Sequence, residues 1–220
     1  MDHYKINSAD YVIKQGKLIG DFEKFYQNVE DPWGQSEKHH TLDTFRQISI
    51  ILCERLRESY GANKVIELGC GFGFITDQLR YRGFNSIGID ISETAILKAR
   101  EKYPSSNFEV STYNDFEFYS RFNPDIIIMA QLTWYVLDTL DMYLEQLKAY
   151  AASQGKPIFL IHLLATYKRG VQIYGADKFT TFDEILNYFN LRYLESGFSQ
   201  TALAEDPNSQ NTYFLAQVNP

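Results

Sequence analysis

Hydrophobic positions along the chain change their spacing near residue 61. From Thr41 to Leu56, apolar residues recur at intervals of three and four, which is the spacing of one helix face. The preceding segment Asp31-Pro32-Trp33-Gly34 is a turn signal. The pattern therefore predicts that residues 1–60 are largely helical, with a break at this turn.

From Lys64 onward, short apolar runs alternate with segments of helical spacing. The runs predict strands over 65–68, 86–90, 108–110, 125–130 and 157–162. The segments between and after them predict helices over 74–82, 92–102, 137–152 and 182–189. Two further strands, at about 192–203 and 212–218, flank the turn signal Asp206-Pro207-Asn208-Ser209 and predict a hairpin. Such alternation predicts an α/β fold with helices on both faces of a parallel sheet.

Glycines cluster directly after the first predicted strand, in Glu67-Leu68-Gly69-Cys70-Gly71-Phe72-Gly73. Glycine allows an unusual backbone turn and the close approach of a ligand. A pyrophosphate-binding loop would read G-x-G-x-x-G, and here Phe74 takes the place of its last glycine. The second strand ends in Asp90, 17 residues after Gly73, where a carboxylate can accept both hydroxyls of a ribose. The alternatives are a structural turn in another α/β domain and, for Asp90, a helix cap.

The segment from Val65 to Arg100 resembles the class I S-adenosylmethionine-dependent methyltransferases, through Val-Ile-Glu-Leu-Gly-Cys-Gly-Phe-Gly, Gly-Ile-Asp-Ile-Ser and Ala-Ile-Leu-Lys-Ala-Arg. The resemblance extends from about Lys64 to the end of the chain. It implies a Rossmann-like sheet of seven mostly parallel strands that closes with a C-terminal antiparallel hairpin. The expected organisation is a helical N-terminal cap over residues 1–60 and a methyltransferase domain over residues 61–220.

The same resemblance implies S-adenosyl-L-methionine as the cofactor and S-adenosyl-L-homocysteine as its product. Glu67, Gly69 and Gly71 would line the methionine moiety, Asp90 would hold the ribose, and Ile91 would pack on the adenine. In the family an acidic residue often follows the third strand, whereas this chain has Ser111-Thr112-Tyr113 there. Thr112 and Tyr113 are therefore the candidates for the adenine contact. The predicted cofactor site also includes two further residues, Cys70 and Gln131.

The end of the fourth strand, Gln131 to Tyr135, bears on the methyl acceptor because strand ends at the carboxyl edge face the ligand crevice. It lacks the Asn/Asp-Pro-Pro-aromatic cluster of nucleic-acid amino-methyltransferases and is more similar to small-molecule methyltransferases. Together with the turn at residues 31–34, Trp134 and Tyr135 resemble the nodulation N-methyltransferase group, though less specifically. That likeness suggests a small polar acceptor, such as a sugar or another secondary metabolite.

Five side chains are candidates for the acceptor side. Trp33, Trp134 and Tyr167 are predicted to contact the acceptor, and Tyr135 is predicted to orient it. His162, at the end of the fifth strand, is the candidate general base that a hydroxyl acceptor would need. For Tyr135 and His162 the alternative is a purely structural role in the core, and for Trp33 it is to anchor the helices to the back of the sheet.

Composition narrows the partners. The formal net charge of −7 argues against a phosphate-backbone partner, so no nucleic acid is expected. Residues 1–17 lack the pattern of a secretory signal, and no apolar stretch is long enough to span a membrane. Cys53 and Cys70 form neither metal-ligand spacing nor a disulfide framework, which favours a cytoplasmic enzyme without a metal. The remaining alternatives are a protein or RNA methyltransferase and a cofactor-binding module without turnover.

Overall fold

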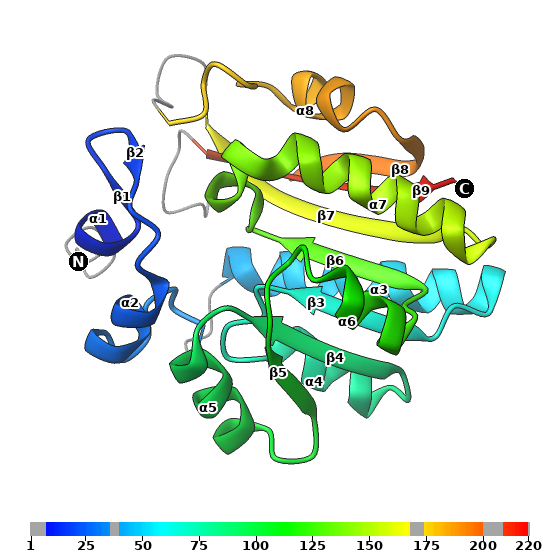
Figure 1. The fold of residues 1–220 in the computed structure, drawn as a ribbon, viewed down its shortest axis with the longest axis horizontal. Helices are drawn as coiled ribbons and strands as arrows, with labels where there is room; N and C mark the ends of the chain where they lie inside the picture. Colours follow the sequence, from blue (N-terminus) through cyan, green and yellow to red (C-terminus); the bar gives the residue numbers. More distant parts are fainter. Residues whose placement is uncertain (1–7, 36–39, 168–173, 200–208, 220) are drawn as a thin grey trace.

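A seven-stranded sheet organises the computed structural model, which describes residues 8–35, 40–167, 174–199 and 209–219 (Figure 1). The strand order is β5-β4-β3-β6-β7-β9-β8. The first five of these strands run parallel, and β9 runs antiparallel to both β7 and β8. The strands are β3 (Lys64–Leu68), β4 (Asn85–Asp90), β5 (Asn107–Val110), β6 (Ile126–Ala130), β7 (Ile158–Tyr167), β8 (Arg192–Ser199) and β9 (Ser209–Val218). The predicted mostly parallel sheet with a closing hairpin is thus confirmed.

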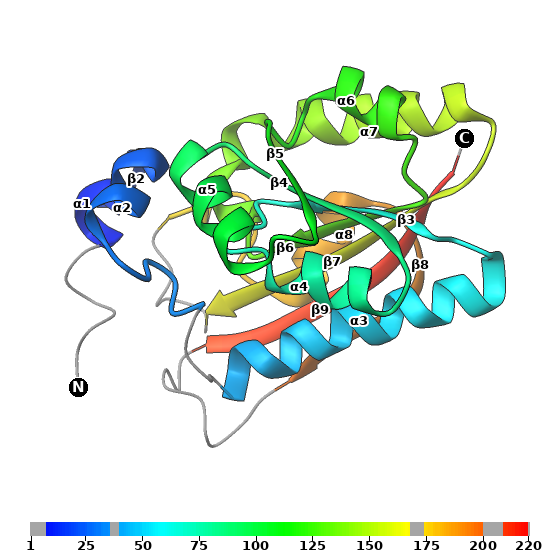
Figure 2. The same cartoon turned by 90° about the horizontal axis from the view of Figure 1, so that it is seen from below.

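Helices cover both faces of the sheet (Figure 2). Helices α3 (His40–Tyr60) and α4 (Phe74–Tyr81) pack on one face. At the end of the sheet formed by β4 and β5, Phe108 of β5 packs against α5 (Glu93–Lys102). The other face is covered by α6 (Phe116–Phe122), α7 (Leu140–Gln154) and α8 (Phe182–Phe189).

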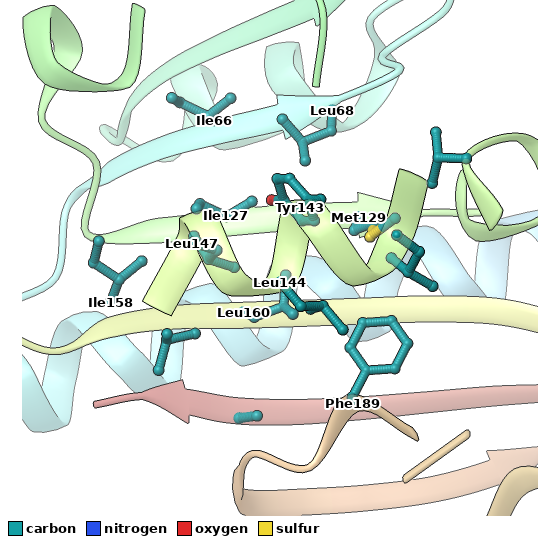
Figure 3. Close-up of a cluster of buried hydrophobic side chains, with 14 of the residues drawn as sticks. Ile66, Leu68, Ile127, Met129, Tyr143, Leu144, Leu147, Ile158, Leu160 and Phe189 are labelled. Atoms are coloured by element: carbon teal, nitrogen blue, oxygen red, sulfur yellow. The ribbon is translucent and has the colours of Figure 1, made fainter. Parts of the chain in front are cut away.

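The largest core lies between α7 and the sheet. Figure 3 shows Tyr143, Leu144 and Leu147 of α7 on the side chains of the central strands, such as Ile127 and Leu160. All four residues Ile126 to Met129 of β6 are fully buried, because this strand has a layer of helices on each face. The core therefore holds the central strands, and with them the carboxyl edge of the sheet, in a fixed position.

The expected cap, residues 1–60, comprises two different parts. Helix α3 packs on the sheet itself. The preceding elements lie beyond the carboxyl ends of the parallel strands (Figure 1). They are α1 (Ser8–Tyr11), a small antiparallel ribbon of β1 (Ile13–Lys14) and β2 (Lys17–Leu18), and α2 (Phe22–Asn28). We call residues 8–35 the lid segment, and its place at this edge brings it over the glycine loop.

Candidate active site at the carboxyl edge of the sheet

The glycine loop, residues 69–73, joins β3 to α4 by a tight turn. Gly71 and Gly73 have positive φ angles of 52° and 78°, which side chains rarely adopt. A Cβ on Gly73 would lie 2.3 Å from the ring of Phe108, so glycine also lets α4 approach β5. The sequence at this turn is therefore dictated by backbone geometry as well as by ligand access.

The backbone N–H groups of residues 70–73 are already used within the protein. Their acceptors are, in order, the Ile89 carbonyl (3.0 Å), the Asp90 carboxylate (3.0 Å), the Gln35 side-chain oxygen (2.8 Å) and the Cys70 carbonyl (2.9 Å). A loop that binds a pyrophosphate points such N–H groups at the ligand. These four groups cannot do so in this arrangement, which argues against a dinucleotide site.

Asp90 ends β4 beside this loop and is only 7% exposed. Its Oδ2 accepts the Gly71 N–H and its Oδ1 accepts the Ser92 N–H, both at 3.0 Å. Burial raises the pKa of Asp90, against the effect of these hydrogen bonds. Each carboxylate oxygen has a second lone pair, so Asp90 can still accept hydrogen bonds from a ligand. The next residue, Ile91, is an apolar side chain that is 60% exposed.

Glu67 faces α4 from β3, and both of its hydrogen bonds use the same oxygen. Thr76 donates to Oε2 through its backbone N–H at 2.8 Å and its hydroxyl at 2.5 Å. Burial raises the pKa of Glu67 to about 7, and the Thr76 bonds and the charge of Arg46 oppose this rise. Glu67 is therefore a buried acid whose pKa lies near neutral pH, and its Oε1 is available to a ligand.

Sequence reasoning missed Arg46, a buried cation near the loop. It lies on α3, is 8% exposed, and its guanidinium stacks 4.6 Å from the centre of the Phe74 ring. Its Nη2 donates to the Gln35 carbonyl at 3.1 Å. The available signal was position, because Arg46 shares a helix face with the buried residues Ser49, Ile50 and Cys53. A buried guanidinium beside a ligand loop is suited to binding a carboxylate.

Comparison with known proteins agrees with this geometry. Residues 65–155 match the family of methyltransferase domains. Over 96 residues, the chain is 30% identical to the ubiquinone biosynthesis O-methyltransferase of Methylococcus capsulatus. The match covers 42% of this chain and 39% of that enzyme, so the chain matches well under half the length of this relative. Residues 65–155 are therefore similar to a methyltransferase domain, and this segment contains the glycine loop and Asp90.

Solved structures with the same fold include two methyltransferases. One is the N-methyltransferase NodS of Bradyrhizobium japonicum in complex with S-adenosyl-L-homocysteine, with a TM-score of 0.58 and 15% identity over 88% of this chain and 97% of that one. The other is the magnesium protoporphyrin IX methyltransferase of Synechocystis with bound S-adenosylmethionine, with a TM-score of 0.56 and 16% identity over 89% and 95%. At these identities the likeness shows the fold alone.

The lid segment is anchored on α5 by Glu23. Its carboxylate accepts from the Ser92 hydroxyl (2.6 Å) and from the Thr94 hydroxyl (2.5 Å) and N–H (3.2 Å). Burial opposes ionisation, but these hydrogen bonds prevail and lower the pKa of Glu23 to about 2. Lys98 also donates to the Tyr26 carbonyl at 2.8 Å. The anchor therefore lies directly after Asp90 and Ile91.

Aromatic rings hold the lid segment to the loop after β6. The Tyr135 ring contacts Trp33 at 5.5 Å and Phe22 at 5.3 Å between ring centres, and Phe25 packs edge-on to Trp33 at 5.0 Å. Two of the predicted acceptor-side residues are thus in contact, Trp33 from the lid segment and Tyr135 from the loop after β6.

His162 lies in the core behind this loop. Its Nε2 hydrogen-bonds the Thr133 hydroxyl at 2.6 Å, and its ring stacks 4.5 Å from the Phe214 ring. Within the described residues its Nδ1 has no hydrogen-bond partner. Burial lowers the pKa of His162 to about 3, so the imidazole is neutral at physiological pH and is a weak base.

The other predicted site residues have varied surroundings. The Trp134 indole donates to the Ala165 carbonyl at 2.8 Å, and its ring packs on Phe179 in the core. The Tyr113 hydroxyl hydrogen-bonds that of Thr139, whereas Thr112 is exposed. Cys70 is buried against α5. The side chain of Tyr167 lies outside the described residues.

The loop after β6, which begins at Gln131, packs on the glycine loop at Gly69 through Leu132. Gln131 has a φ of 56°, rare for a residue with a side chain, and its Oε1 accepts the Ala165 N–H at 2.9 Å. The turn places Leu132 so close to Gly69 that a Cβ there would lie 3.2 Å from it. Backbone strain of this kind concentrates at functional sites.

Proposed function

We propose that this chain is an enzyme that methylates an amine or hydroxyl of a small polar molecule, with S-adenosylmethionine as donor. The observation that carries the proposal is the arrangement of Asp90, Ile91 and Glu67 around a glycine loop whose N–H groups are internally used. Such a site offers acceptors and an apolar surface rather than an anion nest. It therefore suits a nucleoside with an amino-acid tail better than a pyrophosphate.

The residues present fit this donor one group at a time. Asp90 would accept the ribose hydroxyls, and Ile91 would pack on the adenine. Thr112 would border the adenine, because the Ser111 N–H donates to the Asp90 carbonyl at 3.0 Å and holds that loop beside it. Glu67 would accept from the ammonium group, and Arg46 would balance the carboxylate.

When bound, the donor supplies a methyl group that its sulfonium already activates. The chain then has to align the acceptor and exclude water. We propose that Tyr135 orients the acceptor and that Trp33, on the lid segment, shields it from water. His162 would act as a positioning residue, because it is neutral and reaches this edge through the Thr133 hydroxyl. Trp134 would support the same loop from the core.

A small acceptor is favoured by the lid segment, which contacts both the glycine loop and the loop after β6. The acidic net charge of −7 also disfavours an RNA substrate. We further propose a cytoplasmic location, which rests on two cysteines that are buried and unpaired. Among the described residues, none of the helices combines the length and apolar character of a membrane span.

Calorimetric titration tests the proposal. We expect binding of S-adenosylhomocysteine and no binding of NAD. Binding of NAD without binding of S-adenosylhomocysteine would refute the proposal. An assay of donor consumption across amines, sugars and nucleotide sugars would then identify the acceptor class.

A further inference from the structure

Gln35, the last residue of the lid segment, is held in place through both its backbone N–H and its backbone carbonyl. Its N–H donates to the Asp31 carboxylate at 2.7 Å, and its carbonyl accepts from Arg46 at 3.1 Å. Its side chain lies against the glycine loop, since a Cβ on Gly71 would come within 2.4 Å of Oε1 and 2.5 Å of Nε2. The amide therefore lies directly over Gly71.

Chemistry fixes which way this amide faces. The Phe72 N–H is a donor, so the atom that meets it at 2.8 Å must be the oxygen, Oε1. The amide Nε2, with its two N–H donors, is then turned away from that bond. Among the described residues none accepts a hydrogen bond from Nε2. Gln35 thus takes up a loop N–H and presents new donors at nearly the same place.

We propose that Gln35 is a cofactor-binding residue that recognises the carboxylate at the amino-acid end of the methyl donor; this rests on the proposed function. The loop N–H groups of residues 70–73 are used internally and cannot supply donors to that carboxylate. The Gln35 Nε2 and the Arg46 guanidinium can do so. Because Gln35 belongs to the lid segment, the same contact couples donor binding to the position of the lid.

Two ligands separate this role from simple lid closure. S-adenosylhomocysteine carries the amino-acid end, whereas 5′-methylthioadenosine has the adenine, ribose and thioether without it. Gln35→Glu retains an oxygen for the Phe72 N–H but loses the donors and adds a negative charge. Gln35→Met, of similar size, loses both the oxygen and the donors. Gln146→Glu, on the exposed face of α7, is the matched control for the added charge.

Calorimetry on the full chain should show at least about tenfold weaker binding of S-adenosylhomocysteine by both Gln35 variants, because a hydrogen bond to a charged group is lost. Binding of 5′-methylthioadenosine should change less than about twofold, and the control should match the wild type. Equal losses of affinity for both ligands would show that Gln35 only holds the lid segment in place. Tighter binding of both ligands would show that the Gln35 side chain blocks the site in the wild type. Either result overturns the proposal, and so does an unchanged affinity for S-adenosylhomocysteine. Failure of the wild type to bind S-adenosylhomocysteine would instead refute the proposed function.

Discussion

Replacing Glu67 with glutamine should stabilise the fold at neutral and alkaline pH. Both Thr76 hydrogen bonds reach one oxygen of Glu67, so the single amide oxygen of a glutamine can accept them both. The substitution removes the buried charge and replaces the second carboxylate oxygen with an NH2 group. The rise in the Glu67 pKa from 4.5 to about 7 corresponds to about 3 kcal/mol of unfavourable free energy once the group is ionised. This figure already includes the attraction of Arg46, which lowers the Glu67 pKa.

The sign follows from proton binding. Between pH 4.5 and about 7 the folded chain keeps the Glu67 proton while the unfolded chain releases it, so the contribution of Glu67 to stability falls as pH rises. Urea denaturation of Glu67→Gln and wild type should therefore show little difference near pH 5 and a growing advantage for the variant, up to about 3 kcal/mol, by pH 8. The exposed Glu109→Gln is the control. A difference that stays constant with pH, or a less stable variant at pH 8, would refute this reasoning.

Three further substitutions probe the site. Asp90→Asn should weaken S-adenosylhomocysteine binding by tenfold or more. It should also lower the melting temperature, because one amide oxygen must replace two acceptors. An unchanged dissociation constant with lower stability would mean that Asp90 only holds the loop together. Glu23→Gln should speed proteolysis of the lid segment at pH 7 and have a smaller effect near pH 2, where about half of the wild-type carboxylate is itself protonated; equal rates at pH 7 would contradict the anchor. Thr133→Val should lower kcat without altering donor affinity, and the wild-type rate profile should lack an inflection near pH 6.5, whose presence would show His162 titrating.

The fold was predictable where the signal is local. The apolar run of β6 is buried on both faces, and its continuous pattern reports this directly. Strand β7 extends five residues beyond the predicted end because all ten of its residues pair with β9, a partner far along the chain. Helix α6 was missed, although Asp115 caps it by accepting the Phe118 N–H at 2.9 Å. The ribbon of β1 and β2, two residues each, carries no periodicity to detect.

The site residues, too, were predictable only where the sequence signal is local. Asp90 and the glycine loop lie within one strand–helix–strand unit, so sequence spacing places them together. The direction of His162 was not readable, because β7 is buried on both faces and alternate residues point to opposite helix layers. Its even-numbered neighbours Leu160 and Leu164 pack on the α7 side, and His162 follows them. Gln35 meets Phe72 across 37 residues, a contact that no local pattern encodes.

Two of the attachments of the lid segment differ in kind, and this difference bears on how a substrate would enter. On the α5 side Glu23 depends on directional hydrogen bonds from Ser92 and Thr94, which only another donor set could replace. On the β6 side the Tyr135 ring meets Trp33 and Phe22 through ring contacts, which the apolar face of a ligand can replace. Breaking the contacts at Tyr135 therefore costs less free energy than breaking the hydrogen bonds of Glu23. The acceptor would then enter by movement of the Tyr135 ring rather than of the lid segment, because Phe22 and Trp33 lie within two residues of Glu23 and Gln35, which stay in place.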